Sequence, residues 1–375
     1  SEMCIRDSHN VKTQLFRKDV SEIIIATDAG REGELVARWI LDKSGCHKPI
    51  RRLWISSVTD KAIKEGFAHL KDGRAYNDLY HAARSRAEAD WLVGINATRA
   101  LTCKYNAQLS CGRVQTPTLA MIAHREQQIR SFKPEDYYGL RCTTSVTGGS
   151  VGTMASIVTW TWQQKKSGSL RSFNKELITG LDKKLKNQTL TVTDVHTSSK
   201  RTPSPGLYDL TELQRDANKR FGFSAKETLN IMQSLYEHHK VLTYPRTDSR
   251  YIGTDIVPTI KERLKACNIG PYKKYIPELL KKPLRTSKAF VDDKKVSDHH
   301  AIIPTEEYVQ MEHMSNNERK IYDLVVRRFI SVLYPAFEYE QTTLKAEAAG
   351  ETFTAKGKVC LLYTSPSPRD PKTSR

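Results

Sequence analysis

The sequence predicts a multidomain protein that combines an α/β domain with mainly helical and β-rich domains. Its 375 residues exceed the usual size of one domain, and 38% of them are hydrophobic, enough to build packed cores. A short apolar run followed by a helical pattern lies at residues 22–40, which is typical of an α/β unit. Residues 206–334 show helical periodicity, and segments rich in β-branched and aromatic residues lie on both sides of them.

The charge balance points to a polyanionic partner. The chain carries 60 Lys and Arg against 42 Asp and Glu, a formal net charge of +18. Such a surface favours nucleic acid, although many basic proteins bind nothing specific. An anionic membrane is the alternative, but the sequence has no long apolar run and no dominant basic amphipathic helix. The seven cysteines are scattered without a CxxC pair, which indicates reduced thiols in the cytosol and argues against a zinc site.

Both ends of the chain have the character of non-native sequence. Residues 1–8 and 359–375 resemble translated sequencing-adapter read-through. The start has neither the apolar core nor the cleavage site of a signal peptide. We therefore expect residues 9–358 to be an internal piece of a longer protein.

The first site candidate follows the apolar run at residues 22–28, which predicts a buried parallel strand. A strand, a loop and a helix in this order place Asp28 and Glu32 at the carboxyl edge of a sheet, where α/β proteins bind ligands. Two carboxylates among glycines suit an oxygen-ligated Mg²⁺. The alternative is a loop whose acidic groups simply pair with Arg31 and Arg38. The glycine spacing matches neither a dinucleotide-binding motif nor a Walker motif.

The next segments continue the αβ pattern and then become helical. We expect a strand over residues 52–56, a helix over residues 61–70 and a longer helix over residues 82–103. The longer helix carries an apolar stripe of three residues: Trp91, Leu92 and Ile95. It also carries three arginines that either line a groove for DNA or, as is more common, are simply solvated: Arg84, Arg86 and Arg99.

Residues 111–117, Cys-Gly-Arg-Val-Gln-Thr-Pro, predict a loop that enters a helix, with Pro117 tolerated in the first turn. Free backbone N–H groups at a helix start favour a phosphate, and Arg113, Gln115 and Thr116 would add side-chain donors. A plain N-terminal cap explains the same residues equally well on local grounds.

From residue 136 to about residue 200 the hydrophobic period is that of strands, and it returns at residues 342–359. Strand-rich segments on both sides of a helical block predict one antiparallel β domain with another domain inserted into it. We expect the Lys-rich stretches and Gly148-Gly149 between the strands to be turns, and the basic run at residues 183–186 to be a solvated face.

The inserted block begins after the Pro-Ser-Pro linker at residues 203–205. A first helix over residues 207–221 should end at Gly222, and Ser224 should open a second helix through a capping box. That helix runs out at residue 239 and leads to Tyr244. The segment Ser315-Asn-Asn-Glu318 is expected to cap a last helix of the block.

Tyr244 lies in the turn Thr-Tyr-Pro-Arg-Thr-Asp-Ser, where the proline blocks continuation of a helix. Arg246 offers a planar cation suited to phosphate oxygens, and a tyrosine beside it is a candidate nucleophile for a phosphodiester. Most turns of this composition are structural, so the local pattern alone favours a structural role.

His299 stands beside Asp298 and, as a cation, could donate a hydrogen bond to phosphate. A lone histidine is more often structural or exposed. The adjacent histidine pairs at residues 238–239 and 299–300 also raise the question of a metal site. No cysteine or third ligand has a suitable spacing for one.

Five motifs, in the same order along the chain, resemble those of type IA DNA topoisomerases. They are the acidic motif at residues 27–34, Gly-Arg-Val-Gln-Thr-Pro at 112–117, Leu-Tyr-Asp-Leu-Thr-Glu-Leu-Gln-Arg at 207–215, Tyr-Pro-Arg-Thr-Asp-Ser at 244–249 and His-His-Ala-Ile-Ile-Pro-Thr at 299–305. The resemblance covers residues 12–358, and the bacterial topoisomerase III branch is the most similar.

The resemblance implies an incomplete toroid. A partial Toprim domain would span residues 9–77, and a helical DNA-binding domain would span residues 78–134. A β-rich arch would comprise residues 135–205 and 335–358. A helical domain that carries the catalytic tyrosine would be inserted at residues 206–334.

The resemblance also implies an ATP-independent isomerase. Tyr244 would attack a single-strand phosphodiester and keep the 5′ phosphate as a phosphotyrosine. Arg246 would stabilise the transition state, and His299 would donate to the phosphate or relay a proton. Asp28 and the catalytic Glu32 would hold Mg²⁺ for religation. The other site residues would contact DNA: Arg86, Asp90, Arg113, Gln115, Thr116, Thr247, Asp248 and Ser249.

The chain departs from the family pattern in its acidic motif and in its extent. Gly30 stands where the usual Asp-x-Asp-x-Glu has its second aspartate, so the metal would depend on Asp28 and Glu32, with help from Glu34, in a looser site. The family's catalytic glutamate and lysine belong to a strand that would precede this chain. We therefore expect the chain alone to be inactive in relaxation.

The expected partners are single-stranded and negatively supercoiled DNA and, in the cell, a helicase. We expect a monomer in the bacterial cytoplasm, on the nucleoid, without membrane attachment. Two alternatives from other classes stay open: a Toprim-type nuclease or primase, and a non-catalytic basic DNA-binding scaffold.

Overall fold

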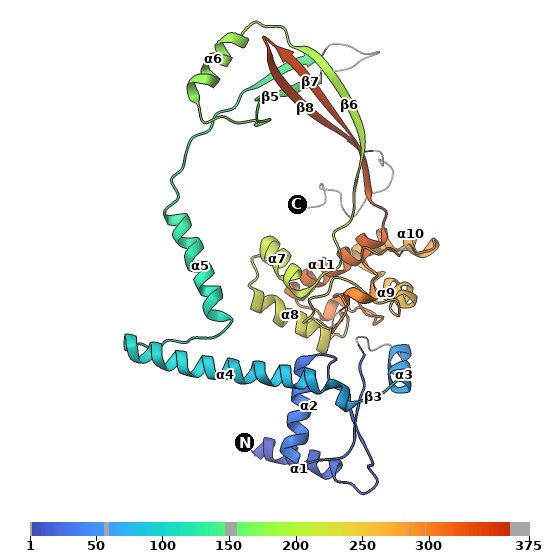
Figure 1. Ribbon diagram of the computed structural model, residues 1–375. Coiled ribbons are helices and arrows are strands. Elements are labelled where there is room, and N and C mark those ends of the chain that lie inside the picture. Colours follow the sequence, from blue (N-terminus) through green and yellow to red (C-terminus); the bar gives the residue numbers. More distant parts are fainter. Residues whose placement is uncertain (1, 56–59, 147–155, 285, 297, 361–375) are drawn as a thin grey trace. The chain divides into compact units, whose positions relative to one another are not determined.

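The computed structural model describes residues 2–55, 60–146, 156–284, 286–296 and 298–360. Two features expected from the sequence lie outside these residues: the turn at Gly148-Gly149 and the tail beyond residue 360. The chain forms two compact units (Figure 1). One comprises Ser1–Ile122 and Pro205–Tyr334, and the other comprises Ala123–Ser204 and Pro335–Arg375.

The first unit begins with a small α/β part. Its sheet has the order β1 (Ile23–Ile25), β2 (Ile50–Arg52) and β3 (Lys71–Asp72), with β1 parallel to β2 and β3 antiparallel to β2. Three helices belong to this part: α1 (Glu2–Leu15), α2 (Arg31–Ser44) and α3 (Asp60–Ala68). The parallel strand and the helix after it are confirmed, but the strand is not buried as predicted, because Ile24 is exposed and only Ile25 is buried. The prediction of a strand over residues 52–56 is wrong, because the strand is Ile50–Arg52, which pairs with Ile23–Ile25, and residues 53–55 lie outside it.

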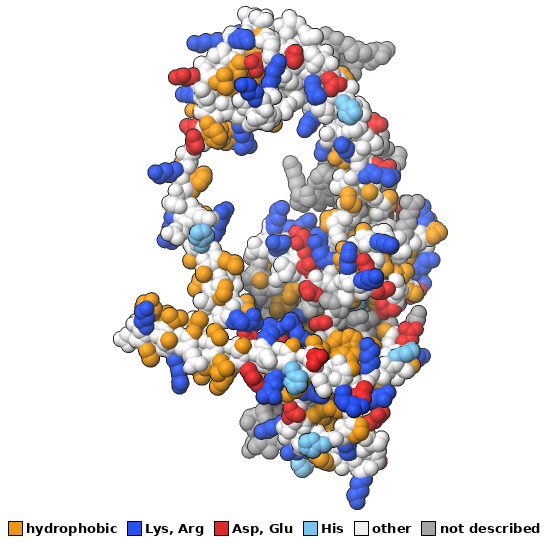
Figure 2. All heavy atoms as spheres, viewed as in Figure 1, with side chains coloured by type: hydrophobic (Ala, Val, Ile, Leu, Met, Phe, Trp, Pro, Cys, Tyr) orange, Lys and Arg blue, Asp and Glu red, His pale blue; other side chains and the backbone are white. Residues whose placement is uncertain are grey.

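The helix α4 (Asn77–Tyr105) confirms the predicted long helix and extends it at both ends. It follows a 3₁₀ turn, η1 (Gly73–Tyr76), and precedes α5 (Gln115–Arg130), which continues into the second unit. Trp91, Leu92 and Ile95 of α4 are exposed, with Trp91 at 65% of its full surface. Figure 2 shows hydrophobic side chains on the surface along α4. Within the described residues this apolar stripe is therefore a surface feature.

A helical block completes the first unit. Its helices are α7 (Leu210–Phe221), α8 (Ala225–Glu237), α9 (Ile260–Ala266), α10 (Ile276–Lys281) and α11 (Asn316–Leu333). Short 3₁₀ turns lie between them: η2 (Val257–Thr259), η3 (Gly270–Lys274), η4 (Asp293–Lys295) and η5 (Met311–His313). A continuous apolar core includes Leu213, Met232, Leu242 and Phe329. It is the largest core cluster of the described residues and gives the following loops a rigid support.

The helix ends of this block follow the sequence signals. Gly222 ends α7 in the left-handed conformation, with φ 73°, and its N–H donates a hydrogen bond to the Asn218 carbonyl oxygen, as predicted. Ser224 caps α8 by accepting a hydrogen bond from the Glu227 N–H at 3.1 Å. At Ser315 both bonds of a capping box are present, since Ser315 Oγ accepts from Glu318 N–H and Glu318 Oε2 accepts from Ser315 N–H.

The capping carboxylate Glu318 should make stability depend on acid. Burial raises its pKa, but hydrogen bonds from Ser234 and Ser315 outweigh this and lower the pKa from 4.5 to about 2. A carboxyl with a lowered folded-state pKa contributes stability that is complete above about pH 4.5 and is lost as the pH falls towards 2. We expect Glu318→Gln to cost about 1–2 kcal/mol at pH 7 and to flatten the acid dependence.

Urea unfolding at pH 7 and pH 3 measures this, with Glu312→Gln as the control because Glu312 is exposed one turn before the same helix. The prediction would be wrong if the free energy of unfolding fell by the same amount from pH 7 to pH 3 in Glu318→Gln as in the unchanged protein.

The second unit is built on a five-stranded antiparallel sheet in the order β4-β5-β8-β7-β6. The strands are β4 (Arg141–Val146), β5 (Ser156–Gln163), β6 (Thr191–Thr202), β7 (Phe337–Ala348) and β8 (Glu351–Cys360). The chain thus leaves the sheet after β6 and returns in β7. The predicted β-rich segments on both sides of a helical block are confirmed.

The prediction that the Lys-rich stretches between the strands are turns is wrong for α6 (Lys175–Leu185). Asn174 caps this helix by accepting a hydrogen bond from the Leu177 N–H at 3.0 Å. Ile178 and Leu181 lie three residues apart on one face and are buried in the cluster that contains Trp160 and Trp162. Burial of this apolar face stabilises the helix, and the lysine-rich composition of the segment gave no sign of it. Lys183 and Lys184 are exposed in its last turn, as expected for a solvated face.

Among the residues described, we find no helix with both the length and the apolar character needed to cross a membrane.

Candidate active site

The loop that carries Tyr244 follows α8 and is held by the segment at residues 301–305. The Thr243 N–H donates to the Ile303 carbonyl at 3.0 Å, and Leu242 forms a β-bridge with Pro304. Val241 and Leu242 are buried, so the chain leaves the core immediately before Tyr244. Tyr244 therefore stands on the extended turn after a helix that the sequence predicts.

Because the Tyr244 loop pairs with residues 301–305, the nearby His299 contacts Tyr244. The ring centroids of the two side chains are 4.3 Å apart, and Tyr236 of α8 makes an edge contact with the other side of Tyr244 at 5.5 Å. Burial raises the pKa of Tyr244, the charge of Asp28 raises it further, and Arg246 acts in the opposite direction. The phenol is thus protonated at neutral pH, and a nucleophilic role for its oxygen would require transfer of that proton.

The acidic loop, which we define as residues 27–34, lies against the same histidine. His299 Nε2 is 4.0 Å from Asp28 Oδ2. The side chains of Asp28 and Glu32 are 65% and 74% exposed, so both carboxylates are open to a ligand. Two segments more than two hundred residues apart in the sequence therefore meet at Tyr244.

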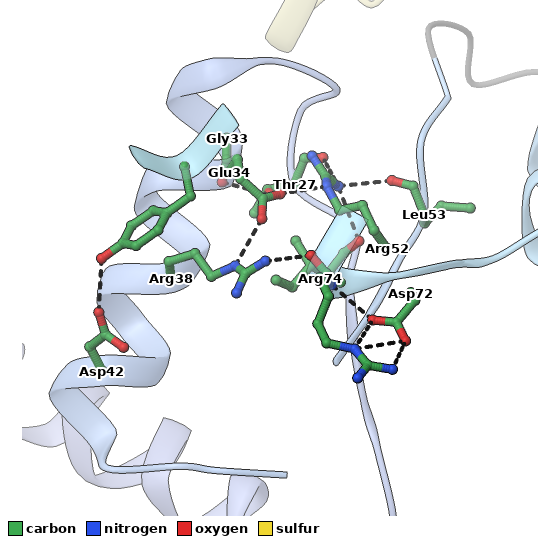
Figure 3. Close-up of polar contacts among 12 residues, drawn as sticks. Thr27, Gly33, Glu34, Arg38, Asp42, Arg52, Leu53, Asp72 and Arg74 are labelled. Carbon is green, nitrogen blue, oxygen red and sulfur yellow. Dashed lines mark hydrogen bonds and ion pairs between the residues drawn. The ribbon is translucent and has the colours of Figure 1, made fainter. Parts of the chain in front are cut away.

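Arg52 holds the backbone of the acidic loop from inside the fold. Its guanidinium donates to the carbonyl oxygens of Thr27 at 2.8 Å and Asp28 at 2.6 Å, and it forms an ion pair with Glu34 at 2.9 Å. Figure 3 shows this cluster, with Arg38 on the other side of Glu34. Sequence reasoning missed Arg52, because an arginine inside a predicted strand gives no sign that it will be buried.

The expectation that Glu34 helps to bind a metal is wrong. Its side chain is fully buried and is shared by Arg38 and Arg52 (Figure 3). Glu34 is the fourth residue of α2, and it is buried, as is Ala37 three residues later on the same side of the helix. A charge-paired carboxylate without solvent access has no lone pair directed at the site.

A series of ion pairs leads away from Glu32. Arg86 lies 3.3 Å from Glu32 Oε1 and 4.0 Å from Asp90, and Asp90 is in turn paired with Arg113. The side chains of Arg86, Asp90 and Arg113 are all partly exposed. The structure thus brings these predicted DNA contacts into one chain of charges that begins at the acidic loop.

The residues at the start of α5 make local contacts. The Gln115 side chain donates to Ser110 Oγ at 3.4 Å, and Thr116 Oγ1 accepts a hydrogen bond from the Gly112 N–H at 3.0 Å. Thr116 thereby closes the loop at residues 112–116 onto the helix start. Both readings of this motif, a helix cap and a phosphate site, fit these contacts.

The three residues after Arg246 have different environments. Thr247 and Ser249 are buried, at 7% and 4% exposure. Thr247 Oγ1 donates to the His299 carbonyl at 2.9 Å, and Ser249 Oγ donates to the Lys295 carbonyl at 2.8 Å. Their hydroxyls hold the loop in place, which differs from the expected direct contact with DNA. Arg246 and Asp248 are exposed.

Asp298, which precedes His299, contacts the acidic loop directly. Burial raises its pKa, His299 and Arg31 lower it, and Asp248 and Asp28 raise it. A Cβ atom placed on Gly30 would lie 2.5 Å from Asp298 Oδ2. Within the described part of the chain no group of three or more His, Cys, Asp or Glu side chains is arranged to hold a metal ion by itself.

A family model described as DNA topoisomerase matches residues 74–362 of the chain. The chain is 62% identical over 351 residues to the DNA topoisomerase 3 of Bacillus cereus (strain ATCC 14579), covering 94% of this chain and 47% of that protein. It is 60% identical over 348 residues to the DNA topoisomerase 3 of Bacillus subtilis (strain 168), covering 93% of this chain and 46% of that protein. The chain thus spans about half the length of the curated relatives that it matches.

Among solved structures, full-length topoisomerase I from Thermotoga maritima has a similar fold. The TM-score is 0.65 at 21% sequence identity, with 96% of this chain and 58% of that chain covered. The combination of α/β, helical and β-rich parts is common to both.

Proposed function

Because this chain belongs to the type IA DNA topoisomerase family, we propose that the complete protein breaks one DNA strand, passes another strand through the break and rejoins the ends. The observation that carries the proposal is the contact of Tyr244 with His299, which in turn reaches Asp28 of the acidic loop. A nucleophile, a proton-transfer group and an exposed carboxylate are thereby grouped in one unit.

In the proposed cleavage step, Tyr244 Oη attacks the phosphorus of a single-stranded phosphodiester. The bond between Oη and phosphorus forms, and the bond from phosphorus to the 3′ oxygen breaks. The phenolic proton passes to a neighbouring acceptor, and the departing 3′ oxygen is protonated. Religation is the reverse of this step, so the phosphotyrosine conserves the bond energy and no ATP is needed.

Arg246 and His299 support this step. The charge of Arg246 already opposes the rise in the pKa of Tyr244, which places the guanidinium within electrostatic reach of the phenol. We assign it the stabilisation of negative charge on the phosphoryl oxygens. His299, in ring contact with Tyr244, is the candidate to donate to the phosphate or to move the proton.

The acidic loop fits Mg²⁺. Asp28 and Glu32 are exposed carboxylates, and Mg²⁺ usually takes one or two carboxylates and completes its shell with water and phosphate oxygens. When bound, the ion would supply positive charge that aligns the cut end for religation; Asp28 and Glu32 would hold it, and Arg52 would fix the loop.

We propose single-stranded and negatively supercoiled DNA as the substrate. Arg86, Asp90 and Arg113 form a charged path from the acidic loop towards Gln115 and Thr116, which suits a sugar–phosphate backbone and gives little sequence preference. The net charge of +18 favours the encounter with DNA. A monomer in the bacterial cytoplasm, associated with the nucleoid and with a helicase as partner, agrees with this function.

A covalent-adduct assay tests the proposal. The complete gene product is mixed with a single-stranded oligonucleotide labelled at its 3′ end, because a 5′-phosphotyrosine retains the 3′ part of the strand. The reaction is stopped with denaturant. We expect a labelled protein band with Mg²⁺-dependent religation. A free nicked product without adduct would indicate a nuclease, and binding without any cleavage would indicate a scaffold.

A further inference from the structure

Arg263 is a buried arginine on the short helix α9. Its side chain is only 5% exposed, and Ile260 and Leu264 of the same helix belong to the apolar core. Burial lowers the pKa of Arg263, and the charge of Glu306 acts in the opposite direction. A guanidinium is costly to bury unless its N–H groups find acceptors, so the partners of Arg263 indicate its role.

The guanidinium of Arg263 joins α9 to a segment some forty residues further along the chain. Nε donates to Thr259 Oγ1 at 2.8 Å, at the start of the helix. Nη1 donates to the Pro304 carbonyl oxygen at 2.7 Å, in a buried contact, and Nη2 forms an ion pair with Glu306 at 2.8 Å. The Glu306 side chain is 44% exposed, so the bond to Pro304 is the part of this clamp that lies inside the fold.

Pro304 belongs to the segment that supports the Tyr244 loop. It forms a β-bridge with Leu242, two positions before Tyr244. A proline has no N–H to donate, and its carbonyl oxygen here accepts from Arg263. Arg263 therefore fixes the supporting segment at the residue that pairs with the base of the Tyr244 loop.

The same supporting segment begins with His299, whose ring lies 4.3 Å from that of Tyr244. Burial lowers the pKa of the neighbouring His300, and the charge of Arg263 lowers it further, so the guanidinium is within electrostatic reach of this end of the segment as well. The contact between the two rings thus depends on where the segment is held, and Arg263 is one of the groups that hold it.

We infer that Arg263 is a positioning residue that, through the Pro304 carbonyl, keeps His299 in place against Tyr244. This inference rests on the proposed cleavage reaction and extends it to a residue outside the sequence motifs. Arg263 has almost no exposed surface with which to contact DNA, in contrast to the exposed Arg246. Its loss should therefore slow the chemical step and leave DNA binding intact.

The test measures cleavage and binding separately in the complete gene product. The rate of adduct formation is followed at saturating 3′-labelled single-stranded oligonucleotide, and the Kd for that oligonucleotide is measured by fluorescence anisotropy. We expect Arg263→Met, which keeps an unbranched side chain without the donors, to slow adduct formation about 10- to 100-fold through misplacement of the reacting groups. The Kd should change by no more than about 2-fold, because single strands bind mainly through exposed charge and stacking.

Glu306→Gln is the matched control. It removes the negative charge paired with Arg263 but leaves the donor to the Pro304 carbonyl in place. We expect thermal unfolding at a lower temperature with adduct formation close to the normal rate. If Glu306→Gln slowed adduct formation as much as Arg263→Met, the effect would follow stability and the inference would be overturned.

Arg263→Lys decides the matter if Arg263→Met does not fold. A lysine keeps the charge but ends one bond short of the Nη1 position, so we expect adduct formation to slow about 3- to 10-fold. A normal rate in Arg263→Lys, or in a folded Arg263→Met, overturns the inference. A Kd that rises by as large a factor as the rate falls overturns it as well.

The unchanged protein separates this inference from the proposed function. An adduct in the unchanged protein, combined with normal rates in the Arg263 variants, rejects the role of Arg263 and leaves the topoisomerase proposal in place. Absence of any adduct in the unchanged protein rejects the proposed function and, with it, the inference that rests on it.

Discussion

Tyr244→Phe is expected to abolish the covalent protein–DNA adduct and to lower plasmid relaxation by the complete gene product roughly 10⁴- to 10⁶-fold, the range found when an enzyme loses its nucleophile. The change removes only the Oη that would attack phosphorus. The ring is retained, so its contacts with His299 and Tyr236 should persist and the loop should keep its place. The measurements are adduct formation with a 3′-labelled oligonucleotide and relaxation of supercoiled plasmid.

Tyr236→Phe is the matched control. Tyr236 presents a second, partly exposed tyrosine hydroxyl beside the same histidine-bearing cluster, with its ring 5.5 Å from that of Tyr244. We expect this variant to form the adduct at nearly the normal rate. If the adduct survived in Tyr244→Phe and disappeared in Tyr236→Phe, the nucleophile would be Tyr236 and the prediction would be wrong.

Glu34→Ala is expected to have the largest effect on stability, a loss of about 3–5 kcal/mol, because it leaves the buried charge of Arg52 without its partner. Both side chains are 0% exposed and lie 2.9 Å apart (Figure 3). Arg52 also donates to the carbonyl oxygens of Thr27 and Asp28, so the acidic loop should loosen as the pair is lost. Urea unfolding measures the first effect, and Mg²⁺ titration measures the second.

Glu88→Ala on α4 controls for a simple loss of charge. Glu88 pairs with Arg84 at 2.7 Å at the same i,i+4 spacing as Glu34 and Arg38, but the side chains of both Arg84 and Glu88 are more than half exposed. We expect a change of about 0–1 kcal/mol there. A loss at Glu34 no larger than this would mean that water reaches Arg52 in solution.

Replacing both members of the buried pair gives a further distinction. In many proteins an apolar pair of similar volume restores stability. Here Glu34→Leu/Arg52→Met should remain destabilised, since the carbonyl oxygens of Ile25, Thr27, Asp28 and Leu53 all lose the donors that Arg52 provides. Full recovery would show that these backbone bonds contribute little.

Local sequence signals predicted the helices well and the interior charges poorly. The ends of α7 and α8 and the capping box at Ser315 depend on residues within four positions of one another, so their patterns are complete in the sequence. The helix α6 was missed because the lysines drew attention away from Ile178 and Leu181, which are buried against Trp160 and Trp162 of the preceding strand β5. The strand β2 lies at Ile50–Arg52, where it pairs with β1, and not at the predicted residues 52–56.

The site shows the same division. Its chemistry could be predicted from the order and composition of the motifs, which placed Asp28, Glu32, Tyr244, Arg246 and His299 in one candidate centre. Whether the neighbouring polar residues are buried or exposed could not be predicted. Thr247, Ser249 and Glu34 belong to the same motifs, but the fold buries them as supports. A motif records which residues occur together and does not separate those that face the ligand from those that hold the loop.

Sequence alone predicted a candidate tyrosine nucleophile and an acidic loop on a mixed scaffold, because strand, helix and cap preferences are set by near neighbours and the order of the motifs can be read from the chain. Only the tertiary structure decided that Asp298 lies over Gly30 and that Arg52 holds the acidic loop. The physical reason is that these contacts join residues far apart in sequence. Their geometry is fixed by how whole segments pack together, and the helix, strand and turn preferences of single residues do not determine that packing.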